Sequence, residues 1–298
     1  MVKLVGDKLN EDAYLADVAG LHYHLTQQGL AGFEVRVQGF SHKLPLLCQR
    51  VFTALASGEF TEAAFEREKE ALVRKYRNAN TQVSKHTNYN RLMALCAQAF
   101  HVDTLLTELE TMTLGDVTKL VAEMLKSCHI ETLVTGNVTR DEAAALAQTH
   151  AQTPLGPGCV APASIRRRDQ CVRLPAGVEL MHKEAAKNPE DENCGVEIYF
   201  QCTEASSYID RAHVDMLDQI LNEPAYNQLR TKEQLGYTVY TGMRLTHGVL
   251  GFCFGVVTSE EADARIEAFI ATNAVALMAG FTEEEFAKQK VTDCVADD

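Results

Sequence analysis

Apolar residues recur at two different periods near the start of the chain, and each period predicts one kind of element. After Asn10, a suitable N-cap, an apolar stripe at helical spacing predicts a helix that ends at Gly29. The stripe consists of Tyr14, Val18, Leu21 and Leu25. Residues 32–40, GFEVRVQGF, instead alternate apolar and polar side chains, which predicts a half-buried strand.

The same criteria predict the elements of the remaining chain. Helices are predicted at 42–56, 61–78, 85–99, 114–127, 207–222, 224–234, 260–278 and from 282 onward. Thr139 and Glu142 have the spacing of a capping box, which begins one more helix that reaches about His150. Strands are predicted at 129–136, 172–183 and 193–202, and a hairpin at 236–245 and 249–257 with His247-Gly248 in its turn.

A segment without periodicity divides this series of elements. Residues 151–168 contain three prolines and two glycines, which predicts an extended linker. We therefore expect one domain over 1–150 and another over 169–298.

Three short sequences occur twice, in the same order, which indicates that the two domains are related. LNEDAY at 9–14 recurs as LNEPAY at 221–226, Gly32-Phe33 recurs as Gly251-Phe252, and TEAAFEREK at 61–69 recurs as TEEEFAKQK at 282–290. Because the repeating unit is longer than two hundred residues, neither copy is expected to be complete. The chain is thus expected to be a piece of a larger protein or an abbreviated relative. Incomplete domains expose sheet edges and apolar helix faces, so self-association is also expected.

Composition and charge narrow the class of protein. With 46% apolar and 23% charged residues the chain is typical of a folded globular protein. No apolar stretch is long enough to predict a membrane span, and no signal peptide is recognisable at the start. The net charge is −13, and the short basic run is confined to 166–168, so no nucleic-acid partner is expected.

The cysteines indicate a reducing compartment. There are nine of them at wide spacings without a CxxC pair, which favours reduced thiols in a cytoplasmic protein. The sequon at Asn137 is then expected to carry no glycan. Sequence spacing gives no support for a Cys–His nucleophile pair.

The histidines do not show the spacing of a metal site. His22 and His24 are two apart on the predicted first helix and are expected to face apart. His213 shares a predicted helix face with Leu217 and Ile220 and is expected to be packed. Neither HExxH nor HxxEH occurs, and GxSxG, Walker A and GxGxxG sequences are also absent. No metal ligand is predicted in this chain.

One pair of residues remains as a candidate site. Arg230 lies near the end of a predicted helix and Tyr237 at the start of a predicted strand, with Gly236 between them. Arginine offers a planar fork of donors to carbonyl oxygens, and a phenol donates one hydrogen bond to a developing oxyanion. The alternative is structural: Arg230 forms an ion pair with Glu233 or Glu223, and Tyr237 packs in the sheet.

The sequence RTKEQLGY at 230–237, preceded by NEP, resembles the insulysin/pitrilysin family of zinc metallopeptidases. NCGVEIYFQ at 193–201 fits the strand before it, while LNEDAYLADVAGL at 9–21 and HIETLVTGN at 129–137 resemble the third of the family's four domains. The resemblance implies an α+β chain with a LuxS/metallopeptidase-like fold: two related, incomplete domains, each an antiparallel sheet backed by helices. Residues 1–150 would be the C-terminal portion of the third domain, and 169–298 the N-terminal portion of the fourth.

The resemblance also implies a function. In the complete enzyme the N-terminal half carries HxxEH and a distal Glu that hold zinc, and the C-terminal half closes a chamber for peptides. Arg230 and Tyr237 would hold the substrate backbone and help stabilise the tetrahedral intermediate. The partners implied are peptide substrates and the N-terminal half, and this chain alone is expected to bind no zinc and to be inactive. The alternatives are a non-catalytic peptide-binding or regulatory relative that pairs with an active subunit, and a scaffold.

Overall fold

The computed structural model describes residues 1–29, 32–156, 168–259 and 262–296, and these form two compact units. The first unit comprises Met1–Arg77 and His101–Asp169, and the second comprises Asn78–Phe100 and Gln170–Asp298. A short segment of the early chain thus belongs to the later unit.

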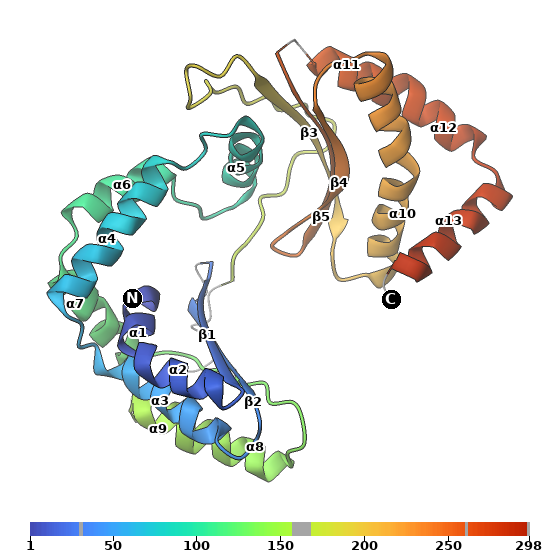
Figure 1. Ribbon diagram of the computed structural model, residues 1–298. Coiled ribbons are helices and arrows are strands. Elements are labelled where there is room, and N and C mark those ends of the chain that lie inside the picture. Colours follow the sequence, from blue (N-terminus) through green and yellow to red (C-terminus); the bar gives the residue numbers. More distant parts are fainter. Residues whose placement is uncertain (30–31, 157–167, 260–261, 297–298) are drawn as a thin grey trace. The chain divides into compact units, whose positions relative to one another are not determined.

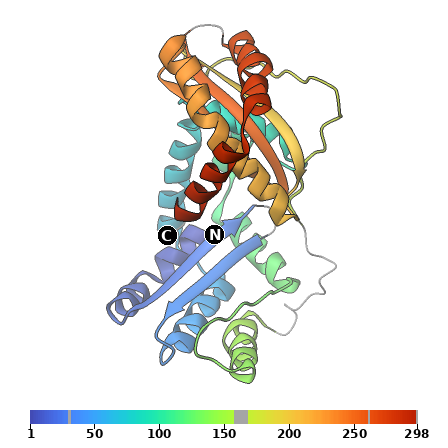
Figure 2. The same ribbon diagram turned by 90° about the vertical axis from the view of Figure 1, so that its right-hand side faces the viewer.

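The first unit has a two-stranded antiparallel sheet with helices packed around it (Figures 1 and 2). In β1 and β2, Leu21 pairs with Gly39 and Gln28 with Gly32. The elements are α1 (Val2–Lys8), α2 (Asn10–Val18), β1 (Leu21–Gln28), β2 (Gly32–Gly39), α3 (Leu44–Ser57), α4 (Glu62–Arg77), α6 (Val102–Thr111), α7 (Leu114–Lys126), α8 (Arg140–Leu146), η1 (Ala147–Gln152) and α9 (Thr153–Leu155). Burial of Val5 and Val51 between α1, α3 and the strands provides the main apolar contact.

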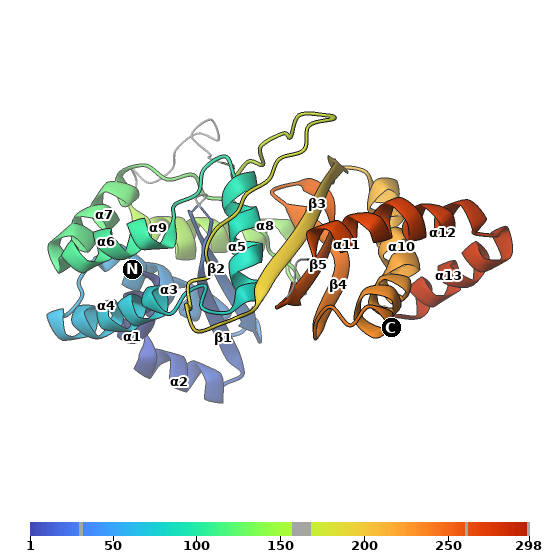
Figure 3. The same ribbon diagram turned by 90° about the horizontal axis from the view of Figure 1, so that it is seen from above.

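The second unit has a three-stranded antiparallel sheet in the order β3-β5-β4. Its elements are α5 (Val83–Leu95), β3 (Cys194–Glu204), α10 (Tyr208–Ala225), η3 (Tyr226–Lys232), β4 (Thr238–Thr246), β5 (Val249–Thr258), α11 (Asp263–Ala268), η4 (Phe269–Ala274), α12 (Val275–Gly280) and α13 (Glu283–Ala296). Helix α10 lies along one face of the sheet and α5 along the other (Figures 1 and 3).

The two faces of this sheet differ in chemistry. Phe252, Phe254 and Val256 alternate along β5 and are buried against α10 and the helices that follow β5. Phe254 packs edge-on against Phe252 and Phe269, with ring centroids 5.2 and 6.0 Å apart. Gly251 and Gly255 lie on the other face, where an added Cβ atom would meet the rings of Tyr199 and Tyr240. Arg91 of α5 lies over the Tyr199 ring on that face. Position along the strand therefore decides which helix a side chain meets.

The repeat seen in the sequence is reproduced in the order of elements. In the first unit α2 precedes the hairpin β1–β2, and α3 and α4 follow it. In the second unit α10 precedes the hairpin β4–β5, and the helices from α11 to α13 follow it. Both hairpins are antiparallel, as expected from related domains, and the α+β class is confirmed. The assignment of 1–150 and 169–298 to the family's third and fourth domains stays a prediction.

The single helix predicted from Asn10 to Gly29 is wrong in its second half. Leu21, Tyr23 and Leu25 lie on β1 and point to the core, while His22 and His24 between them are exposed. A pairing with β2 satisfies the backbone of this segment, and the alternation of burial has the period of a strand. Leu21 and Leu25 fit a helical stripe and a strand equally well, because four residues separate them.

Four further expectations are corrected. The described residues of 129–136 and 172–183 contain no strand, because neither segment forms a backbone ladder with one of the strands. Residues 151–155 continue a helix rather than beginning the linker, and 157–167 of the predicted linker lie outside the described residues.

One helix of the structure, α6, was not predicted from the sequence. His213 is exposed, because the buried position of that turn of α10 is Val214.

Among the described residues no single helix has the length and apolar content needed to cross a membrane. Residues 263–280 and 283–290 meet that criterion only as a pair, bent by 96° at the break between them. Ile266 and Phe269 of this pair are buried in the core of the second unit.

Candidate functional site

The candidate site is built on the end of the helix formed by α10 and η3. Ser207 caps this helix, and its side chain accepts a hydrogen bond from the backbone N–H of Asp210. Residues 226–232 continue the helix with π-type hydrogen bonding, and Leu229 is fully buried among them. The burial of Leu229 fixes the rotation of this last turn. It leaves the neighbouring residue, Arg230, only partly covered.

A tight turn joins η3 to β4 and fixes the position of Tyr237. The backbone N–H of Leu235 donates to the carbonyl of Leu229 at 3.1 Å, and the Leu235 side chain is buried. Gln234 before it has a φ of +55°, which lets the chain reverse. A Cβ atom on Gly236 would stand 2.0 Å from the carbonyl oxygen of Val257, so the backbone passes β5 at a distance that only glycine permits.

Arg230 and Tyr237 lie next to each other at this turn. The guanidinium carbon of Arg230 is 5.2 Å from the centroid of the Tyr237 ring, within the range of a cation–π contact. The Tyr237 side chain is 87% exposed, and Arg230 lines an open hollow of about 520 Å³ with Tyr226, Thr231 and Gln234. The buried Nε of Arg230 has no hydrogen-bond partner among the described residues.

The described residues show no ion pair of Arg230 with Glu233 or Glu223, the partners named in the structural alternative. Glu233 forms an ion pair with Arg265 at 3.1 Å and accepts a hydrogen bond from Gln228 at 2.8 Å, rather than pairing with Arg230. Tyr237 precedes β4 and lies outside the sheet. The arrangement presents a cation and a phenol side by side to solvent. Their role in binding or catalysis stays a prediction.

A buried polar cluster between α5 and the sheet was not foreseen from the sequence. Arg91 Nε lies 2.6 Å from Glu197 Oε1, with the two side chains 8% and 3% exposed. The Tyr240 hydroxyl donates to the other oxygen of Glu197 at 2.9 Å, and burial next to this carboxylate raises the pKa of Tyr240. A charged residue within the apolar alternation of β3 was the one signal of this cluster in the sequence.

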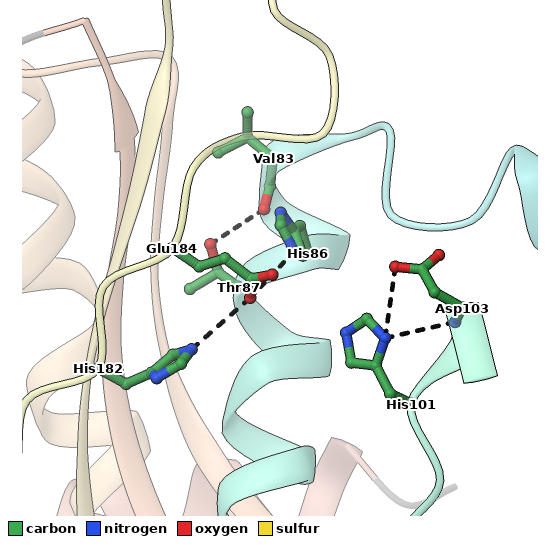
Figure 4. A network of polar contacts seen from close by, with 7 residues as sticks. All are labelled: Val83, His86, Thr87, His101, Asp103, His182 and Glu184. Carbon is green, nitrogen blue, oxygen red and sulfur yellow. Dashed lines mark hydrogen bonds and ion pairs between the residues drawn. The ribbon is translucent and has the colours of Figure 1, made fainter.

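One histidine arrangement differs from the one expected. His22 and His24 lie on one face of β1, not on opposite faces of a helix, because strand residues two apart point the same way. His22 Nδ1 is 2.8 Å from Asp17 Oδ1. In the same unit His101 caps α6 by accepting the backbone N–H of Asp103 at 3.3 Å (Figure 4).

In the second unit a glutamate lies between two histidines. The Nε2 atoms of His86 and His182 are each 3.6 Å from Glu184 Oε2, and Figure 4 shows the two rings on opposite sides of the carboxylate. The Glu184 carboxylate links α5, which carries His86, to the segment before β3, which carries His182. The three side chains do not surround a common position that a metal ion could occupy. No group of three His, Cys, Asp or Glu side chains in the described part of the chain is arranged to share a metal ion.

The chain is similar in sequence to known peptidases. Residues 1–108 match the family model "Middle or third domain of peptidase_M16", and residues 111–291 match "Peptidase M16 inactive domain". The chain is 34% identical over 300 residues to the insulin-degrading enzyme of Homo sapiens, covering 96% of this chain and 28% of that protein. It is 35% identical over 265 residues to a nardilysin-like protein of Arabidopsis thaliana, covering 87% of this chain and 25% of that protein.

The fold is also shared with a solved structure. The crystal structure of pitrilysin superposes with a TM-score of 0.82 and 24% sequence identity, covering 98% of this chain and 30% of that chain. This chain therefore spans between a quarter and a third of the length of the proteins it matches here.

Proposed function

The chain belongs to the peptidase M16 family, and on this premise we propose that it forms the C-terminal part of an insulysin-like zinc metalloendopeptidase. Its two matched regions follow each other in the order third domain, inactive domain. The relatives that support the proposal include both insulin-degrading enzyme and nardilysin, at about one third identity. In this proposal the chain acts on peptides together with an N-terminal half.

The pairing of Arg230 with Tyr237 is the observation that carries the proposal. The guanidinium lies against the phenol ring, which limits the rotamers of both side chains before any peptide arrives. The Arg230 fork would donate to a main-chain carbonyl of an extended peptide. The exposed Tyr237 hydroxyl would donate one hydrogen bond to the oxygen that becomes negatively charged during cleavage.

We assign the zinc of this family to the N-terminal half. The residues of this chain do not fit the zinc ligands of the family, since HxxEH is absent from the sequence and the described side chains include no triplet of suitable ligands. Zinc would supply an activated water in the complete enzyme. The part assigned to this chain is to bind and orient the peptide backbone.

A second candidate is a non-catalytic relative that binds peptides or pairs with an active subunit. The description "inactive domain" of the model that matches residues 111–291 favours it. In that case Arg230 and Tyr237 contribute to affinity and to no chemical step. Self-association of the chain, expected from exposed apolar surface, is also a proposal, and light scattering of the purified chain tests it.

Turnover and binding measurements separate these candidates. In the enzyme formed by this chain and an HxxEH-bearing half, Arg230→Ala and Tyr237→Phe are expected to lower peptide turnover at least tenfold without changing the circular dichroism spectrum. Tyr208→Phe is a matched control, because Tyr208 is 86% exposed at the start of α10. Wild-type turnover in both variants would remove the role of the pair. Peptide binding measured by fluorescence anisotropy, with no effect of either variant on turnover, would favour the non-catalytic candidate.

A further inference from the structure

Two cysteines from distant parts of the chain face each other across an isolated antiparallel bridge in the second unit. Cys96 follows the last residue of α5, and Cys171 lies in the segment that leads toward β3. The backbone N–H of Ala97 donates to the carbonyl of Gln170 at 2.8 Å, and that of Val172 donates to the carbonyl of Leu95 at 2.7 Å. The residues on either side of the cysteines thus make the hydrogen bonds.

This pattern fixes how closely the two cysteines approach. In an antiparallel pair, directly opposite residues that do not exchange hydrogen bonds have Cα atoms about 4.5 Å apart and side chains on the same side. A disulfide requires Cα atoms about 4.4–6.8 Å apart. The backbone arrangement of Cys96 and Cys171 therefore lies within the range that accepts a disulfide, and no disulfide joins these two residues in this structure.

A glutamine from the neighbouring strand holds Cys171 in place. The side-chain amide of Gln201 on β3 donates to the carbonyl of Val172 at 3.0 Å and contacts Cys171 Sγ at 3.6 Å. Its carbonyl oxygen accepts the backbone N–H of Leu174 at 2.9 Å. The segment that carries Cys171 is in this way fixed to the sheet, although it is not itself a strand.

A histidine lies beside the other cysteine. Nε2 of His247, in the turn between β4 and β5, is 3.3 Å from Cys96 Sγ. An imidazole at hydrogen-bond distance accepts the proton of a thiol and so generates the thiolate, which is the reactive form. Cys96 is partly exposed and His247 is exposed, so a small oxidant reaches them. These residues are 151 positions apart, so sequence spacing gave no sign of the pair.

We propose that Cys96 and Cys171 form a reversible redox modification site, in which His247 activates Cys96 for reaction with a peroxide. The Cys96 thiolate attacks one oxygen of hydrogen peroxide, the O–O bond breaks, and the sulfur becomes a sulfenic acid. The hydroxide released takes the proton from His247 and leaves as water. The Cys171 thiol then loses its proton as its sulfur attacks the sulfenic sulfur. The S–S bond forms, the S–O bond breaks, and the hydroxide released takes that proton and leaves as a second water. Overall, two thiols lose two electrons and one peroxide becomes two waters, and a dithiol reverses the change.

Burial is consistent with the order of these steps. The surroundings of Cys171 raise its pKa, mainly through desolvation, so it remains a thiol while the thiol next to His247 reacts first. The product would join the end of α5 covalently to the segment before β3. Since α5 covers the buried Arg91–Glu197 pair, the cross-link would hold this helix on the sheet.

Peptide mapping of the full chain tests the site. The chain is treated with an equimolar amount of hydrogen peroxide at pH 7, blocked with N-ethylmaleimide and digested. The expected product is a peptide pair joined through Cys96 and Cys171 that dithiothreitol separates. Cys171→Ser is expected to stop at a Cys96 sulfenic acid that dimedone traps. Cys202→Ser, a matched control on β3, is expected to leave the cross-link unchanged. A cross-link from Cys96 to any other cysteine, or none, overturns the proposal.

The part played by His247 is tested separately by the rate of Cys96 alkylation with iodoacetamide. His247→Asn is expected to lower this rate at least fivefold at pH 7 and to leave it unchanged at pH 10, where the thiol ionises without assistance. A merely structural effect would lower the rate at both values. Equal rates at pH 7 would remove His247 from the proposal.

Discussion

Gly236 passes the carbonyl oxygen of Val257 so closely that a Cβ atom at this position would stand 2.0 Å from it. This contact fixes the turn between η3 and β4, and with it the place of Tyr237 beside Arg230. The candidate site therefore depends on a residue without a side chain.

Gly236→Ala is expected to destabilise the chain by about 1–3 kcal/mol, because the backbone of β5 has to move to admit the methyl group. The measurement is the free energy of unfolding in urea. Gly280→Ala, at the end of α12, is the matched control, since no atom lies within 4 Å of a Cβ there. Equal stability of the two variants would contradict the close packing of this turn.

The geometry of Arg230 predicts that lysine does not replace it. In the complete enzyme proposed above, Arg230→Lys would retain the positive charge but lose the planar fork and the contact of the guanidinium with the Tyr237 ring. We expect kcat of the Arg230→Lys variant to fall by a factor of about 10–100. This is most of the loss that we expect for Arg230→Ala. Steady-state kinetics on both variants provide the test. Full activity of the lysine variant would show that charge alone suffices.

The buried pair of Arg91 and Glu197 predicts strong coupling between α5 and β3. Arg91→Met leaves the Glu197 carboxylate buried without its cation, and a loss of about 3–5 kcal/mol is expected. Arg91→Met combined with Glu197→Gln is expected to recover part of that loss, because no uncompensated charge remains. A double-mutant cycle in urea measures the coupling energy, and additive losses would contradict the pairing.

Two buried acids predict a loss of stability at alkaline pH. Burial raises the pKa of Cys253 from 9.0 to about 12 and that of Tyr199 from 10.0 to about 12. A folded-state pKa above the unfolded value means that the native state holds its protons more tightly. This stabilisation is complete below about pH 9 and is lost as the pH rises toward 12.

Thermal unfolding followed from pH 7.5 to 11 measures this dependence, and the midpoint is expected to fall steadily above pH 9. Cys253→Ala is expected to make the fall shallower, while Cys194→Ser, at an exposed position on β3, is expected to leave it unchanged. A midpoint independent of pH in the unmodified chain would contradict the burial of these groups.

The sequence predicted correctly those elements that are determined by residues close to one another in the chain. The strand at 32–40, the hairpin turn at His247-Gly248 and the capping box of Thr139 with Glu142 all depend on residues within a few positions of one another. The predictions at 129–136 and 172–183 were wrong for the opposite reason. An apolar run indicates that a segment can be buried, but a strand also needs a neighbour that the run does not specify.

The sequence by itself determined the repeat and the RTKEQLGY segment at 230–237, because caps and motifs are properties of adjacent residues. The α+β class followed from the family that this segment resembles. Only the tertiary structure decided that Arg91 meets Glu197 in the interior and that Cys96 meets His247 at the surface. Those contacts join residues more than a hundred positions apart. They form because burial of the apolar faces of the helices and strands brings distant segments together, and no local pattern records which polar residues then become neighbours.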